Sequence, residues 1–243
     1  MKSFRIAAAI IGGALVLSSL ATSGVPGQIL AEVTGNVSVF ETGSSQPMQD
    51  ASRVVVWLVP ADPSSPSHSN REKSHYRMLQ HNKMFEPNFL VVPLGSVVDF
   101  PNLDPWFHNV FSLYRGKRFD LGLYQAGAQK TVRFDRPGPS FLFCNIHPQM
   151  TAVIMAVESD LFAVSNKAGF ISIANVTPGK YVLHVWHEDA TPDTVHTLER
   201  TITLGPTDNT LPLISIQITK HDKSPHKDKY GREYDPNSAS PPY

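Results

Sequence analysis

The sequence predicts an all-β protein built from β-sandwiches. Short runs of alternating or β-branched residues recur at spacings of roughly 8–12 residues, which is typical of a sandwich or barrel. Turn-forming stretches separate these runs, among them residues 42–47 and 135–138. The central part of the chain shows no convincing amphipathic helical pattern. With 41% hydrophobic residues among 243, the chain can bury a core of ordinary size.

Two β-strands are expected near the N-terminus. Residues 32–40 alternate apolar and polar side chains, the pattern of a strand with one buried face. Residues 53–59 form a β-branched and aromatic run, which is typical of a buried strand. Residues 60–70 are rich in proline and serine and are interpreted as a linker.

Further strands are expected over the central region of the chain. They span residues 96–100, 110–111, 129–134, 141–144 and 152–157. Gly95 precedes the first of them and indicates a turn. Residues 119–124 are interpreted as an irregular apolar segment.

A second group of strands is expected toward the C-terminus. They span residues 161–164, 169–173, 181–186, 200–204 and 213–218. Residues 177–179, Thr-Pro-Gly, indicate a turn between two of them. The polar residues 220–243 contain too few apolar side chains to order themselves, so a disordered tail is predicted.

The first 23 residues have the pattern of a secretory signal peptide. Lys2 and Arg5 give a positive start, and residues 6–20 are apolar or small. Residues 21–23 then have the form of a cleavage site. An uncleaved anchor is the alternative, but the apolar run is short for a membrane span of about 20 residues. We therefore expect an exported, periplasmic protein with no membrane span after cleavage.

The charge balance bears on whether the partner is a nucleic acid. Lysine plus arginine and aspartate plus glutamate number 21 each, so the formal net charge is +0. No basic cluster lies on a recognisable helix. The sequence therefore gives no indication of nucleic-acid binding.

The single cysteine, Cys144, lies in a short stretch rich in metal ligands. His147 follows it by three residues, and Met150 follows His147 by three. A lone cysteine in an exported chain cannot form an internal disulfide, so it is a dimer link, a buried bystander or a ligand. A thiolate, an imidazole and a thioether on one loop favour the last, because two His, one Cys and a weak axial Met form the blue-copper arrangement. His108 is the candidate for the second histidine.

Residues 76–157 resemble the cupredoxins, the blue-copper proteins. The Cys144–His147–Met150 spacing is that of the amicyanin branch, and His108 with Asn109 resembles the family's first-ligand motif. The match is nearest to periplasmic plastocyanin-like or methylamine-utilisation-like proteins. The resemblance implies a Greek-key sandwich holding one copper per chain through His108, Cys144, His147 and Met150. It also implies that Asn109 hydrogen-bonds to the cysteine loop.

An apolar shell is expected around this site. It would exclude water and tune the reduction potential of the metal. The expected members are five phenylalanines: Phe100, Phe107, Phe111, Phe141 and Phe143.

The flanks of this region carry a second resemblance. Residues 43–58 and 169–183 are similar to the two halves of a carboxypeptidase-regulatory-like, or transthyretin-like, β-sandwich. We therefore expect a cupredoxin domain at residues 70–157, inserted into a smaller sandwich formed by residues 28–62 and 158–219.

Three functions compete for this sequence. The first is single-electron transfer with redox proteins that the sequence does not name. The second is copper delivery or storage with the same ligands in a more open site. The third, an oxidase or nitrite reductase, needs further copper centres with paired His-x-His ligands, and the chain has no His-x-His. A degenerate, metal-free cupredoxin is disfavoured by the complete ligand set.

Overall fold

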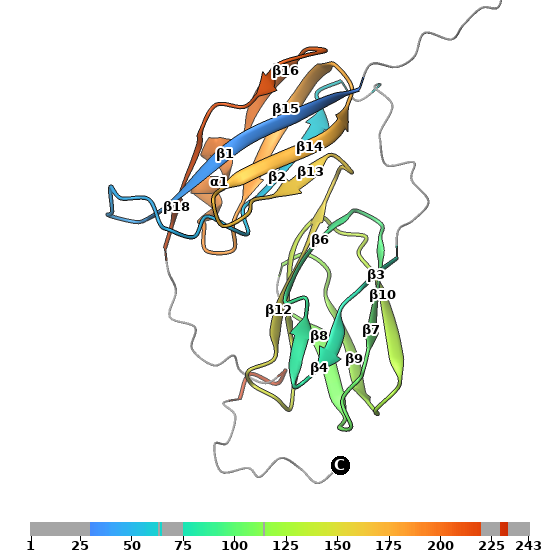
Figure 1. Ribbon diagram of the computed structural model, residues 1–243. Coiled ribbons are helices and arrows are strands. Elements are labelled where there is room, and N and C mark those ends of the chain that lie inside the picture. The colour runs from blue at the N-terminus through green and yellow to red at the C-terminus, as the bar shows by residue number, and fades with distance from the viewer. Residues whose placement is uncertain (1–29, 63, 65–74, 114, 220–228, 233–243) are drawn as a thin grey trace, which may run out of the picture.

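The computed structural model describes residues 30–62, 64, 75–113, 115–219 and 229–232. The expected signal peptide, residues 1–23, and most of the expected tail, residues 220–243, lie outside these ranges. The described residues form two groups of β-sheets (Figure 1). The expectation of an all-β fold is confirmed, with one short helix as the exception.

The first group of sheets combines the two ends of the described chain. Its first sheet is built around β1 (Ala31–Glu41), which pairs with β14 (Phe170–Val176), β17 (Asn209–Thr210) and β18 (Ile214–Ile218). Its second sheet has the order β13 (Phe162–Val164), β2 (Val55–Pro60), β15 (Gly179–Trp186) and β16 (Arg200–Leu204). The helix α1 (Pro192–Leu198) connects β15 to β16.

The second group contains every described strand between residues 75 and 157. A five-stranded sheet has the order β6 (Phe89–Pro93), β12 (Thr151–Val157), β11 (Gly138–Phe143), β8 (His108–Ser112) and β9 (Phe119–Tyr124). A three-stranded sheet has the order β10 (Gln129–Arg133), β7 (Val97–Pro101) and β3 (His75–Arg77). A small hairpin joins β4 (Leu79–His81) to β5 (Met84–Glu86).

Strand pairing keeps the two groups separate. Within the described part of the chain, β1 and β2 pair only with strands that follow residue 160, and β3 to β12 pair only with one another. The backbone N–H of Leu58 donates to the carbonyl of Leu161 at 2.9 Å. The chain therefore re-enters the first group of sheets close to the point where it left that group.

An apolar cluster joins the two groups. Its buried members are Val55, Trp57, Val91, Val153, Met155, Val157 and Trp186. They come from β2 and β15 in the first group and from β6 and β12 in the second, which are the upper and lower groups in Figure 1. The indole N–H of Trp57 donates to Glu158 at 3.1 Å, and the Arg53 guanidinium lies 4.6 Å from the Phe89 ring centre. Burial of this cluster favours a fixed arrangement of the two groups.

One local expectation was wrong, and one element was not predicted. Residues 119–124, expected to be irregular, form the edge strand β9, which pairs with β8. The sequence analysis also missed α1, in which Thr191 caps the helix by accepting from the N–H of Thr194.

No helix of the described chain is long and apolar enough to cross a membrane.

Candidate metal centre

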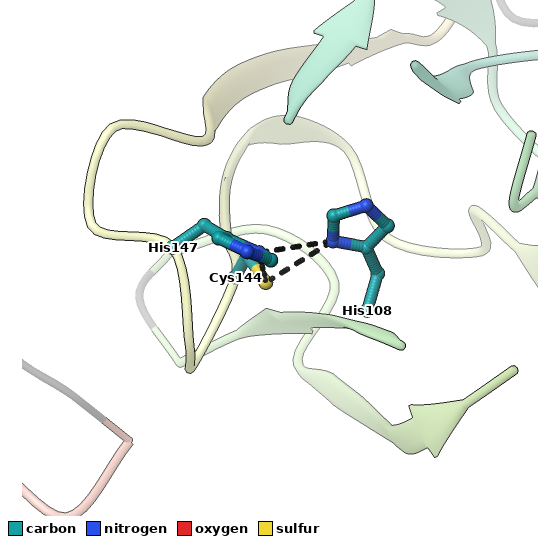
Figure 2. Close-up of side chains that lie close together, drawn as sticks. All are labelled: His108, Cys144 and His147. Atoms are coloured by element: carbon teal, nitrogen blue, oxygen red, sulfur yellow. Dashed lines mark hydrogen bonds between the residues drawn. The ribbon is translucent and has the colours of Figure 1, made fainter. Parts of the chain in front are cut away.

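Two neighbouring strands bring the candidate ligands to one end of the five-stranded sheet. Cys144 follows the last residue of β11, and His108 is the first residue of β8. The two strands are antiparallel and pair at Phe143 and Phe111, so the end of one lies beside the start of the other. Figure 2 shows His108 facing Cys144 and His147 across the gap between strand and loop.

The ligand loop is closed by its own backbone. The N–H of Cys144 donates to the carbonyl of Met150 at 3.2 Å, and the N–H of Met150 donates to the carbonyl of His147 at 3.0 Å. Pro148 follows His147 and restricts the backbone further. The positions of Cys144 and His147 are therefore fixed by the loop itself as well as by the sheet.

Three ligand atoms converge in this arrangement. Sγ of Cys144 lies 3.7 Å from Nδ1 of His147 and 3.9 Å from Nδ1 of His108, and the two Nδ1 atoms are 3.1 Å apart. A triangle of these dimensions has a point about 2 Å from all three atoms, which is the length of a metal–imidazole bond and slightly less than that of a metal–thiolate bond. Among the described residues, His108, Cys144 and His147 are the group of side chains placed closely enough to hold a metal ion together.

A buried carboxylate orients His108. Nε2 of His108 donates to Oδ2 of Asp104 at 2.7 Å, and both side chains are buried. A carboxylate only accepts, so the proton of a neutral imidazole is placed on Nε2 and the lone pair on Nδ1. That lone pair faces Cys144 and His147, as a metal ligand requires.

Asp104 is held in turn by the β4–β5 hairpin. The backbone N–H groups of Asn82 and Lys83 donate to its two carboxylate oxygens at 2.7 and 2.8 Å. Both of these residues have positive φ, 52° and 55°, as a two-residue hairpin turn of this kind requires. The turn therefore points two N–H groups at the carboxylate that positions His108. The sequence analysis missed Asp104, although its spacing four residues before His108 was a usable signal.

Burial and hydrogen bonds set the charges at the site. Burial, and to a smaller extent the nearby His108 and Lys83, lowers the pKa of His147 to about 4. Burial also lowers the pKa of His108, which Asp104 opposes only in part. For Asp104, burial raises the pKa, but the donors Lys83, His108 and Asn82 outweigh it, so the pKa lies below its usual value. Both imidazoles are therefore neutral at pH 7 and free to bind a cation.

The thiol of Cys144 is shielded from water. It is 0% exposed, and burial raises its pKa, although the backbone N–H groups of Asn109, Ile146 and His147 act in the opposite direction. A metal ion must therefore displace the proton of the thiol. The three N–H groups are already placed to stabilise the thiolate that results.

The structure places the remaining predicted residues as follows. Met150 is 0% exposed and belongs to the same core cluster as Cys144. Asn109 directs its backbone N–H at the sulfur of Cys144, while its side-chain Nδ2 donates to Asp120 at 2.8 Å. The Oδ1 atom of Asn109 is buried with no hydrogen-bond partner among the described residues.

The expected phenylalanine shell is largely wrong. Phe100 does lie in the core cluster that contains Cys144. Phe111 and Phe143 instead pack on each other, with ring centres 5.8 Å apart, and Phe141 packs against the cluster between the two groups of sheets. Successive residues of a strand face opposite sides, so the strand that turns Leu142 toward the site turns its neighbours away.

Similar solved structures were found, whereas no protein-family model and no curated protein matches the chain. The copper-containing nitrite reductase of Thermus scotoductus aligns with 41% of this chain at 24% identity and a TM-score of 0.34. The chain spans only 27% of that enzyme. A purple cupredoxin of Nitrosopumilus maritimus aligns with 34% of this chain and 99% of its own, at 20% identity and a TM-score of 0.31.

A reduced, Cu(I) form of an amicyanin variant aligns with 42% of this chain and 98% of its own, at 15% identity and a TM-score of 0.33. The similar solved structures are cupredoxins. The resemblance expected from the sequence names the same family. Since each alignment covers less than half of the chain, the function has to be inferred from the ligand geometry.

Proposed function

We propose that this chain is an exported type 1 copper protein that transfers single electrons. One copper ion would be held by His108, Cys144, His147 and Met150. The convergence of Sγ of Cys144 and the two Nδ1 atoms on one point carries this proposal.

The donor set favours copper. A thiolate with two imidazoles and a weak axial thioether is the arrangement of blue-copper sites, whereas structural zinc sites use four strong nitrogen or sulfur ligands. Met150 would supply the thioether, because it is buried in the core cluster of Cys144 at the end of the same loop. Copper bound in this way supplies a one-electron couple.

The fixed positions of the ligands support a role in electron transfer. His108 is held by Asp104, and the loop of Cys144 and His147 is closed by backbone hydrogen bonds. Ligands that are fixed before the metal binds move little when its charge changes, so the reorganisation energy is small. A site built for copper delivery would need to open more easily.

His147 is the least deeply buried of the three converging side chains. His147 is 6% exposed, whereas His108 and Cys144 are both 0% exposed. Trp106, two residues before His108, is 43% exposed and lies under the Lys83 ammonium at 4.8 Å. Transient redox complexes use small interfaces, so His147 and Trp106 would form a docking edge for redox partners.

An enzymatic role is not favoured. Copper oxidases and nitrite reductases need additional copper centres, and the chain has one cysteine and no His-x-His. Copper delivery or storage is the second candidate, because it would use the same ligands.

Copper retention and electron self-exchange separate these two candidates. We expect the protein to keep Cu(I) in the presence of a mild chelator and to exchange electrons rapidly. Trp106→Ala should slow the exchange without releasing copper. Phe170→Ala is the matched control, because Phe170 is similarly exposed, at 45%, but lies on β14 in the other group of sheets. Rapid loss of Cu(I) with slow exchange would favour delivery.

Export is the remaining part of the proposal. Residues 1–23 have the pattern of a signal peptide, so the exported protein should begin near Gly24 and be recovered from the periplasm. N-terminal sequencing of the recovered protein tests this directly. A protein that begins at Met1 and sediments with membranes would contradict it.

A further inference from the structure

A short C-terminal segment lies against the ligand loop. Lys229–Arg232 comes after the last strand of the other group of sheets, yet the backbone N–H of Lys229 donates to Oδ1 of Asn145 at 3.0 Å. Asn145 is the residue directly after Cys144. The segment therefore contacts the loop that carries three of the four candidate ligands.

The side chain of Lys229 makes a second contact at this end of the sheet. Its Nζ donates to Oδ2 of Asp120 on β9 at 2.8 Å. The hydrogen bond to Asp120 is the main reason that the pKa of Lys229 is raised. Lys229 thus binds the loop through its backbone and the neighbouring strand through its ammonium group.

Asp120 passes this contact on to Asn109. Its other oxygen, Oδ1, accepts from Nδ2 of Asn109 at 2.8 Å and from the N–H of Gly122 at 2.9 Å. Asn109 is 1% exposed and follows His108 directly. Its backbone N–H is one of the three that point at the sulfur of Cys144. Hydrogen bonds therefore lead from Lys229 through Asp120 to the side chain of Asn109. The backbone N–H of the same residue acts to lower the pKa of the Cys144 thiol.

We propose that Lys229 is a positioning residue for the Cys144 ligand, acting through Asp120 and Asn109. The side chain of Asp120 is 36% exposed, so water can compete for its oxygens. Lys229 holds one oxygen in place, which keeps the other oxygen directed at the buried amide of Asn109. With respect to the metal, this inference rests on the proposed copper function.

The contact should also raise the reduction potential. A cation near the metal disfavours its more positively charged, oxidised form. An N–H group held on the thiolate withdraws charge from the sulfur, which acts in the same direction. Loss of Lys229 should therefore lower the potential by both routes.

The first test uses the copper-free protein, so that it does not depend on the proposed function. In full-length, ¹⁵N-labelled protein, Lys229→Met should shift the side-chain amide signals of Asn109 and speed their hydrogen exchange. Lys229→Arg should restore both, because arginine can still donate to Asp120. Lys117→Met is the matched control, because Lys117 forms an ion pair of the same length, 2.8 Å, with Asp135. The side-chain amide of Asn109 binds Asp120 and not Asp135.

The second test uses the copper-loaded protein. Lys229→Met should lower the reduction potential and shift the thiolate-to-copper absorption band, whereas Lys229→Arg and Lys117→Met should leave both unchanged. Unchanged Asn109 amide signals in Lys229→Met would overturn the inference, as would an unchanged potential and band. Wild-type protein without a charge-transfer band would overturn the copper function, while the copper-free measurement would still decide whether Lys229 positions Asn109.

Discussion

Asp104 and His108 form a buried pair in which Oδ2 of the carboxylate lies 2.7 Å from Nε2 of the imidazole. This contact places the only exchangeable proton of the neutral ring away from Cys144 and His147. Because Nδ1 of His108 already carries a free lone pair, the ring needs no change of tautomer before it binds a metal. Asp104 thus orients one candidate ligand in the metal-free protein.

Replacement of Asp104 by asparagine should weaken copper binding by about 10- to 100-fold, the usual cost of losing such a partner. Asp104 accepts from Asn82 at Oδ1 and from Lys83 and His108 at Oδ2, so in either orientation of the amide at least one of these N–H groups would face another donor. Competition with a chelator of known affinity measures the effect. Asp135→Asn removes an exposed carboxylate and serves as control. Equal affinities of Asp104→Asn and wild type would contradict the positioning role.

Met150→Leu should keep the colour of the copper protein and raise its reduction potential. A thioether is a weak donor that stabilises the oxidised metal slightly, whereas the colour arises from the thiolate. Met155→Leu is the control, because Met155 is also buried but packs in the cluster between the two groups of sheets. If both variants had the wild-type potential, Met150 would not be a ligand.

The copper-free protein should lose stability as the pH falls from 6.5 toward 4. The unfolded chain binds a proton at His147 near pH 6.5, whereas the folded chain does so only near pH 4, mainly because the ring is buried. Between these values the unfolded state holds more protons, so the free energy of unfolding falls by about 1.4 kcal/mol per pH unit for this group. His108, whose pKa is also lowered, adds to the slope.

Urea unfolding at a series of pH values measures this slope. His147→Asn should reduce this slope, because it removes the buried imidazole. A slope that is the same in wild type and His147→Asn would show that His147 is accessible to protons in the folded state.

The positions of most strands along the chain could be predicted, because the spacing of apolar residues reflects which side chains are buried. In β1, buried residues such as Val37 and Val39 alternate with more exposed ones, as the sequence pattern indicated. The edge strand β9 was missed because its inner and outer faces differ little, and only Tyr124 in it is buried. The signal for α1 was present but local: Thr191 as cap and Pro192 at the first turn.

The candidate ligands could be named from the sequence, but the residues that contact them could not. Cys144, His147 and Met150 follow one another on one loop, so their spacing alone indicates a site. Asp120 and Lys229 lie 109 positions apart and meet only through the tertiary fold. No periodic or spacing rule connects such residues, so contacts of this kind require the structure.

The insertion proposed for residues 70–157 can be tested by deletion. Because Leu58 and Leu161 are hydrogen-bonded, a short Gly/Ser linker between residues 62 and 158 should span the gap. We expect a β protein that unfolds cooperatively, with a tendency to self-associate because Trp57 and Trp186 lose their apolar cover. Circular dichroism during urea unfolding measures the cooperativity. A disordered product would favour one continuous fold.

The visible absorption spectrum of copper-loaded protein tests the central claim most directly. We expect one copper per chain and an intense thiolate-to-copper charge-transfer band, because Sγ of Cys144 and two Nδ1 atoms converge on one point. Cys144→Ser should abolish the band, whereas Ser140→Cys, which adds a buried thiol earlier on β11, should leave it unchanged. A colourless wild-type protein, or a Cys144→Ser variant that keeps the band, would contradict the assignment of the copper site to this loop.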